Sequence, residues 1–173
     1  MKVAIFIEDL VEDVEFIYPY YRFKEEKFEV DVISPEIKKF RGKKGCTFVS
    51  KKSIKDVDPE DYDILFIPGG YAPDRLRRYP EILNFVRRMN ELNRIIGSVC
   101  HGPWVLISAG IVRGKKITGY FAIKDDIENA GAKYTGKPVE IDGNIITGQD
   151  PESMAELLKL IIKEAKKMKP GPF

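Results

Sequence analysis

The stretch IIGSVCHGPWVLISAG, residues 95–110, decides the fold, because it joins a strand directly to a helix. Residues 95–99 form a mostly apolar run of strand length, and we expect a helix at residues 102–109. Gly110 predicts the end of that helix, since glycine readily adopts the left-handed conformation that closes many helices. The segment is therefore one strand–helix unit of an α/β sheet.

Similar apolar runs occur at residues 2–7, 30–34 and 64–67, each bounded by turn residues. A parallel sheet that is covered on both faces requires such continuous runs of Val, Ile, Leu and Phe. Helical patterns fill the intervals at residues 14–26 and 80–92. This order predicts an α/β fold of flavodoxin-like type: a doubly wound, mostly parallel sheet with helices on both faces.

Two short antiparallel hairpins are expected to interrupt this order. One joins residues 37–40 to 46–49, and the other joins residues 139–142 to 144–147 around a strong Asp-Gly turn signal. The last helix follows Asp150 as its cap and Pro151 at its first position. One apolar stripe runs along it: Met154, Leu157, Leu158, Ile161, Ile162 and Ala165. Repeats and linkers are absent from the sequence, so we expect one domain over residues 1–173.

The composition, with 43% hydrophobic and 32% charged residues, is that of a folded globular protein. A net charge of +2 is too small to predict nucleic-acid binding, and we interpret the basic stretches 38–44 and 159–169 as solvated faces. We expect neither a membrane span nor a signal peptide, and a cytoplasmic location. Few Gln, Cys and Met residues among many charges suit a thermophile.

The candidate chemistry lies in the loops that follow the predicted strands, where open α/β sheets bind their ligands. Ser98, Cys100 and Gly102 have the small-x-nucleophile-x-small spacing of a nucleophile elbow. The thiol would sit at the N-terminus of the following helix, whose dipole and free N–H groups are expected to lower the pKa of Cys100. The spacing therefore indicates a reactive cysteine.

For both cysteines the alternative is a buried, inert core thiol. Cys46 fits that alternative, because it lies in a strand-like run without polar company, whereas polar and turn residues follow Cys100 at a strand end. His101, the only histidine, is either a structural residue or the general base for Cys100. One histidine and two distant cysteines do not supply a zinc site, and we expect no metal and no other cofactor.

Two further loops have open interpretations. The Gly70 N–H could join the N–H of His101 in an oxyanion hole, or Gly69-Gly70 is only a tight turn. Asp13 and Glu15 are natural first-turn acids of the helix at residues 14–26 and need no function. Glu12 could be one more such acid.

Several motifs, spread along nearly the whole chain, resemble the PfpI intracellular-protease family, in the superfamily of the parkinsonism-associated deglycase. These motifs are Glu12-Asp13-Val14-Glu15, Pro68-Gly69-Gly70, Cys100-His101-Gly102-Pro103, Ile107-Ser108-Ala109-Gly110 and Ile123-Lys124-Asp125-Asp126. The resemblance implies a flavodoxin-like fold and a cysteine-dependent hydrolase, with Cys100 as nucleophile and His101 as its partner. It also implies a homo-oligomer built from dimers, often a hexamer.

The resemblance extends to three more site residues. The family completes its triad with a glutamate of a neighbouring subunit, and Asp74 occupies that position here, one methylene shorter. Glu12 matches the acid that contacts the cysteine and can hydrogen-bond its sulfinate form. Tyr120 matches a tyrosine near the pocket, but Phe121-Ala122 replaces the usual Pro-Gly, which would reshape the substrate rim.

The family resemblance leaves several activities open. A hydrolase could act on peptides as a protease, or on glyoxal-derived protein adducts as a deglycase, with Cys100 attacking a carbonyl or hemithioacetal carbon. A cofactor-independent glyoxalase that yields a hydroxy acid is chemically close. The alternative from another class is a non-enzymatic stress protein, a redox sensor or chaperone in which Cys100 is oxidised. The Cys-His-acid set favours the enzyme, because oxidation sensing does not require His101.

Overall fold

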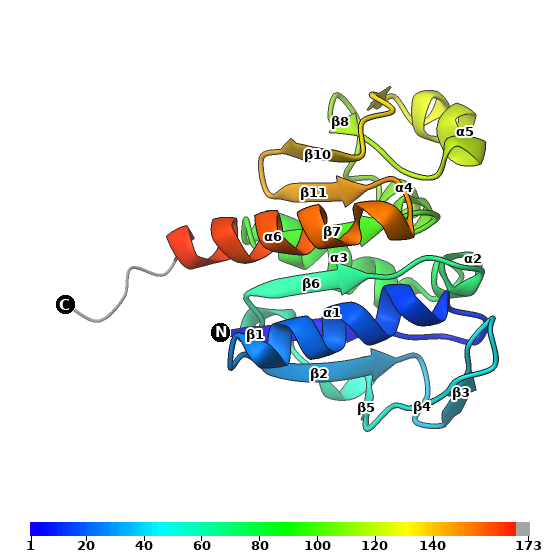
Figure 1. The fold of residues 1–173 in the computed structure, drawn as a ribbon, viewed down its shortest axis with the longest axis vertical. Coiled ribbons are helices and arrows are strands. Elements are labelled where there is room, and N and C mark those ends of the chain that lie inside the picture. The colour runs from blue at the N-terminus through cyan, green and yellow to red at the C-terminus, as the bar shows by residue number, and fades with distance from the viewer. Residues whose placement is uncertain (169–173) are drawn as a thin grey trace.

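The computed structural model describes residues 1–168, and residues 169–173 of the predicted domain lie outside this range. Its centre is a seven-stranded sheet with the order β10-β11-β7-β6-β1-β2-β5 (Figure 1). The strands are β1 (Lys2–Phe6), β2 (Glu29–Ser34), β5 (Lys52–Ser53), β6 (Ile64–Ile67), β7 (Ile95–Val99), β10 (Val139–Asp142) and β11 (Ile145–Gly148). Every neighbouring pair is parallel except β10 with β11. The predicted flavodoxin-like, mostly parallel sheet is confirmed.

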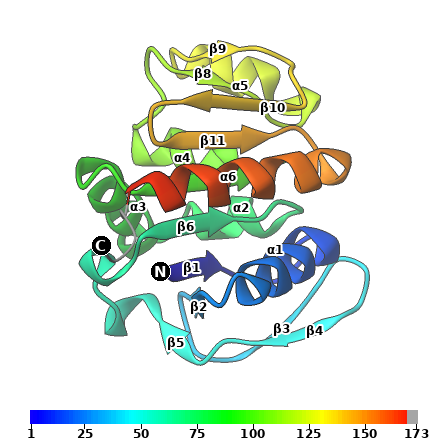
Figure 2. The ribbon, with the colours of Figure 1, turned by 60° about the vertical axis from the view of Figure 1, so that its left-hand side comes forward.

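Helices cover both faces of this sheet. They are α1 (Asp13–Glu25), α2 (Ala72–Leu76), α3 (Pro80–Glu91), α4 (Pro103–Ala109), α5 (Lys124–Asn129) and α6 (Met154–Met168). In Figures 1 and 2, α1 and α6 lie on one face, and α3 and α4 lie on the other. Side chains of β1 alternate between two cores, because Val3 and Ile5 join the core under α1 and α6 whereas Ala4 and Phe6 join the other.

The predicted helix ends are confirmed. Gly110 closes α4 with a φ of 74°. The side chain of Asp150 accepts a hydrogen bond from the Ser153 N–H, and Pro151 begins a short 3-10 turn that leads into α6. All six residues of the predicted apolar stripe of α6 are buried.

Both hairpins form, but the structure adds elements that the sequence did not predict. β3 (Lys39–Arg41) pairs with β4 (Thr47–Val49), and β10 pairs with β11, antiparallel in both cases. β5, β8 (Lys116–Ile117) and β9 (Lys133–Tyr134) have two residues each, too few to produce a periodic pattern. α2 stands where a loop was expected, with Pro73 in its first turn. Within residues 1–168, no helix combines the length and apolarity required to cross a membrane.

Candidate active site

The predicted site residues Glu12, Gly70, Cys100, His101 and Tyr120 meet at one cavity of about 390 Å³ at the carboxyl ends of β1, β6 and β7. This active-site cavity is lined by Glu12, Glu15, Lys43, Gly70, Tyr71, Cys100, His101, Tyr120 and Pro151. The cavity therefore combines a thiol, an imidazole, two carboxyl groups and an ammonium group.

Cys100 forms the predicted elbow between β7 and α4. Its φ is 58°, in the left-handed region that residues with a side chain rarely adopt, and 8% of its surface is exposed. A Cβ on Gly102 would lie 2.2 Å from Oγ of Ser98, so the turn has no room for a larger residue there. The small residues of the motif are thus a steric requirement of the strained turn.

Two backbone N–H groups donate hydrogen bonds to the thiol of Cys100, one from Gly70 and one from His101. Gly70 has a φ of 77°, and a Cβ there would lie 2.3 Å from the backbone nitrogen of Glu12. The loop after β6 therefore needs glycine at this position to bring its N–H to the sulfur. Gly69-Gly70 is thus more than a tight turn, because the Gly70 N–H reaches the sulfur of Cys100 together with that of His101.

The imidazole of His101 lies against the thiol, with its Nδ1 3.2 Å from Sγ of Cys100. The ring packs between Trp104 and Tyr120, at centroid distances of 5.0 and 5.1 Å. Burial and the charge of Lys43 lower the pKa of His101, so the ring is neutral near pH 7 and able to accept a proton. Tyr120 thus lies at the pocket as predicted and holds the ring.

The acid that contacts the cysteine is Glu15, and the prediction of Glu12 was wrong. Glu15 is fully buried, and its Oε2 accepts a hydrogen bond of 2.7 Å from the N–H of Gly69. Burial raises the pKa of Glu15 to about 7. Glu12 lies just before α1 and lines the same cavity, where its carboxylate pairs with Lys43 at 3.3 Å.

The sequence does contain a signal for Glu15. It stands four residues before Pro19 and eight before Phe23, and all three are buried on one face of α1. A carboxyl group within an apolar stripe lowers the stability of the fold, or it is there because it has a function. The interpretation of Glu15 as an ordinary first-turn acid overlooked this spacing.

The pKa of Cys100 differs from the sequence-based expectation. Burial and the neighbouring Glu15 raise it to about 12, against the smaller opposing effect of the Gly70 and His101 N–H groups. α4 has only seven residues, and its dipole does not offset these effects. The resting site is therefore a neutral thiol beside a neutral imidazole.

Two other predicted positions lie away from the cavity. Asp74 is in α2 and pairs with Arg78, and among residues 1–168 no carboxylate is hydrogen-bonded to the imidazole of His101. Cys46 is exposed rather than buried, because it precedes β4 at the end of the hairpin turn. Its thiol hydrogen-bonds to Asp13, which raises the pKa of Cys46.

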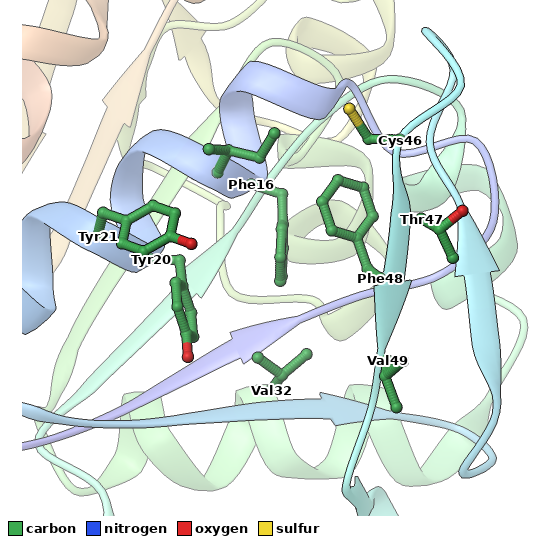
Figure 3. Close-up of a pocket in the computed structure, with 9 residues that line it drawn as sticks. Phe16, Tyr20, Tyr21, Val32, Cys46, Thr47, Phe48 and Val49 are labelled. Carbon is green, nitrogen blue, oxygen red and sulfur yellow. The ribbon is translucent and has the colours of Figure 1, made fainter.

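Cys46 borders a separate apolar hollow between α1 and the β3–β4 hairpin (Figure 3). The hollow is lined by Phe16, Ile17, Tyr20, Tyr21, Val32, Cys46, Thr47, Phe48 and Val49. It contains neither the imidazole nor the paired N–H donors found at Cys100. The two cysteines thus occupy different chemical surroundings.

Lys43 is a site residue that the sequence interpretation missed. The basic stretch 38–44 was expected to be a solvated face, yet Lys43 lines the active-site cavity. Its backbone N–H donates to the carbonyl of Val11 at 2.8 Å, which fastens the turn of the β3–β4 hairpin beside the loop after β1. The direction in which a hairpin folds is a tertiary property that residue composition does not encode.

The chain is similar to known proteins along almost its whole length. Residues 1–164 match the model of the DJ-1/PfpI family. A deglycase of Pyrococcus horikoshii is 39% identical over 163 residues, covering 94% of this chain and 98% of its own. The protein/nucleic acid deglycase 2 of Escherichia coli is 36% identical over 156 residues, covering 88% and 91%.

A solved structure gives the same result. The two-domain protein of Anabaena variabilis, with DJ-1/ThiJ/PfpI-like and ferritin-like domains, superposes with a TM-score of 0.93 at 39% identity. The match covers 94% of this chain and 47% of that one. Sequence and structure comparisons therefore agree along almost the whole chain.

Proposed function

Since the chain belongs to the DJ-1/PfpI family, we propose that it is a cysteine-dependent hydrolase that removes glyoxal-derived groups from proteins. The observation that carries the proposal is the Cys100 thiol, 3.2 Å from the imidazole of His101 and held by two backbone N–H donors. Relatives named deglycases support the choice of substrate class.

The neutral thiol–imidazole pair fits acyl transfer by general-base catalysis. Nδ1 of His101 takes the thiol proton as the sulfur of Cys100 adds to the carbonyl carbon of a 2-hydroxyacyl adduct. The N–H groups of Gly70 and His101 stabilise the oxyanion. The protein amine or thiol leaves with the proton from His101, and water then hydrolyses the thioester to release a 2-hydroxy acid.

A glyoxal-derived hemiaminal becomes a 2-hydroxyacyl adduct when a hydrogen moves from its carbinol carbon to the adjacent carbonyl carbon. The shift is internal, so the whole reaction consumes one water and needs neither an oxidant nor a reductant. Free glyoxals hydrated at the same site would give the glyoxalase reaction. Unmodified peptides would give the peptidase reaction.

A substrate panel tests the proposal. Glycated peptides, unmodified peptides and methylglyoxal are offered to the wild-type protein, with Cys100→Ser as the control. We expect release of the 2-hydroxy acid from the glycated peptides only with the wild type. Turnover of unmodified peptides alone would replace the deglycase assignment with a peptidase.

The redox alternative has one observation in its favour. Oε1 of the buried Glu15 has no hydrogen-bond partner among residues 1–168, and the Glu15 carboxyl lies beside the sulfur. The oxygen of an oxidised sulfur would accept a hydrogen bond from this carboxyl group when the group is protonated, below its pKa of about 7. His101→Ala separates the two functions: the hydrolase is expected to lose about 10²-fold or more in turnover, whereas peroxide oxidation of Cys100, followed by mass spectrometry, does not depend on an imidazole base. Unchanged hydrolysis in His101→Ala would remove the hydrolase mechanism.

The proposal also includes a dimer-based homo-oligomer in which Asp74 of one copy approaches His101 of another. Asp74 lies in α2, and its side chain is 47% exposed to solvent. Mixing Cys100→Ser with Asp74→Asn subunits tests this, because a mixed oligomer regains one site with both groups intact. Light scattering and mass spectrometry show whether the oligomers contain both variants. If they do and the activity does not recover, Asp74 has no role across an interface. Asp74→Glu, which restores the length usual in the family, is expected to raise activity.

A further inference from the structure

Among the residues of 1–168 that line the active-site cavity, Lys43 is the only one with an ammonium group. It is held there by the backbone of its hairpin. The N–H of Lys43 donates to Val11, and Asp13 accepts hydrogen bonds from the N–H groups of Lys44 and Cys46, at 2.7 and 2.9 Å. A Cβ on Gly42 would lie 2.5 Å from the Asp13 carboxyl, so the chain passes tightly over that clamp. The position of Lys43 is thus built into the hairpin.

The group open to a ligand at this point is the ammonium of Lys43, because it is more exposed than the neighbouring carboxylate. Oε2 of Glu12 lies 3.3 Å from Nζ of Lys43, and Oε1 lies 4.0 Å from Nζ of Lys44. The Glu12 side chain is 12% exposed, whereas that of Lys43 is 41% exposed. An ammonium group has three donors, and one ion pair leaves the others available. A ligand anion therefore finds a partner here more readily than a ligand cation does.

We propose that Lys43 forms a carboxylate subsite in the active-site cavity, beside the sulfur of Cys100, that takes a small 2-hydroxy acid. The identity of this acid rests on the proposed function, because hydrolysis of a glyoxal-derived group converts its acyl carbon into a carboxylate at the sulfur. The subsite itself rests on the position of Lys43: its ammonium group lines the cavity, is 41% exposed and is paired with one carboxylate, Glu12. Lys43 also lies 5.4 Å from the ring centroid of Tyr71, which limits where its side chain can go.

Alkylation of Cys100 measures the subsite without any turnover. Iodoacetate places a carboxylate next to the carbon that the sulfur attacks, and iodoacetamide is its neutral counterpart. The ratio of the two rates reports the attraction for the carboxylate, because any change in thiolate fraction affects both reagents equally. A Cys46→Ser background removes the exposed thiol and keeps a hydroxyl group beside Asp13.

In this background Lys43→Met is expected to lower the iodoacetate-to-iodoacetamide ratio about fivefold, the size of a partly exposed ammonium–carboxylate contact. Lys44→Met is the matched control, because it removes the same charge from the next residue, which does not line the cavity. Lys43→Arg keeps the charge and is expected to retain the ratio. L-Lactate is expected to slow alkylation by iodoacetamide, whereas neutral lactamide is not, and this protection should disappear in Lys43→Met.

A change below about twofold in Lys43→Met, or an equal change in Lys44→Met, would overturn the subsite. The result is independent of the proposed function. If wild-type protein leaves glycated peptides intact but the ratio falls in Lys43→Met, the subsite stands and the deglycase assignment fails. If glycated peptides are hydrolysed and the ratio is unchanged in Lys43→Met, the deglycase assignment stands and the subsite fails.

Discussion

Cys100 and Cys46 have more in common than their separate surroundings suggest. Each thiol lies beside a carboxyl group, Glu15 for the first and Asp13 for the second, and each has a raised pKa. What differs is the set of partners that can act during a reaction. Cys100 has an imidazole at 3.2 Å and two N–H donors, whereas Cys46 has neither in its hollow. Under the proposed function, the sulfur of Cys100 acts through its reaction partners and not through a low thiol pKa.

The largest expected effect comes from replacing each thiol in turn. Cys100→Ser should lower hydrolysis of glycated peptides by at least about 10³-fold, because the hydroxyl is a weaker nucleophile in the same place. Cys46→Ser should leave the rate within about twofold. Steady-state release of the 2-hydroxy acid measures both. A large loss in Cys46→Ser would erase the distinction between the two thiols.

The second effect concerns the carboxyl group beside Cys100. Burial raises the pKa of Glu15 from 4.5 to about 7, so the folded protein binds a proton that the unfolded chain releases. This contribution to stability is complete below pH 4.5 and is lost as the pH rises through 7. Glu15→Gln cannot titrate. Between pH 4.5 and 8, its free energy of unfolding should therefore rise by about 3 kcal/mol relative to that of the wild type.

Urea denaturation at a series of pH values measures this difference. Glu12→Gln is the control, because it removes a carboxylate at the same cavity that pairs with Lys43 rather than with the protein interior. It should keep most of the fall in stability seen in the wild type, because burial is the main cause of the raised pKa of Glu15 and the charge of Glu12 is a smaller one. Parallel curves for Glu15→Gln and wild type would mean that Glu15 is ionised throughout.

The smallest effect concerns the carboxyl group beside Cys46. Burial opposes ionisation of Asp13, but the N–H bonds from Lys44 and Cys46 outweigh it and lower the pKa of Asp13. Asp13→Asn replaces one acceptor oxygen by a donor and should cost about 1–2 kcal/mol of stability at pH 7. The difference should shrink as the pH falls below 3.8, where Asp13 begins to be protonated in the unfolded chain. Denaturation midpoints at pH 7 and pH 3 test it, and a constant difference would contradict the assignment.

The sequence predicted well the features that depend on local pattern. The apolar runs placed β1, β2, β6 and β7, and the spacing around Cys100 predicted a turn whose steric reason is now visible at Gly102. The sequence did not predict Glu15 and Lys43 as site residues, because their positions in the site depend on partners far away in the chain. Glu15 needs the N–H of Gly69, 54 residues away, and Lys43 needs a hairpin folded toward the cavity. Asp74 remains a prediction about a neighbouring copy.

The β3–β4 hairpin lies outside the seven-stranded sheet that carries Cys100. The thiol that we propose as the nucleophile and the ammonium group that we propose to select its ligand therefore lie on separate pieces of the chain. The side chain of Lys43 can change without altering the contacts of the strained elbow, whereas the buried Phe40 and the bonds to the loop after β1 hold the hairpin itself in place. Relatives with the same nucleophile are then free to diverge in what they accept, and a transplanted hairpin should carry its preference with it.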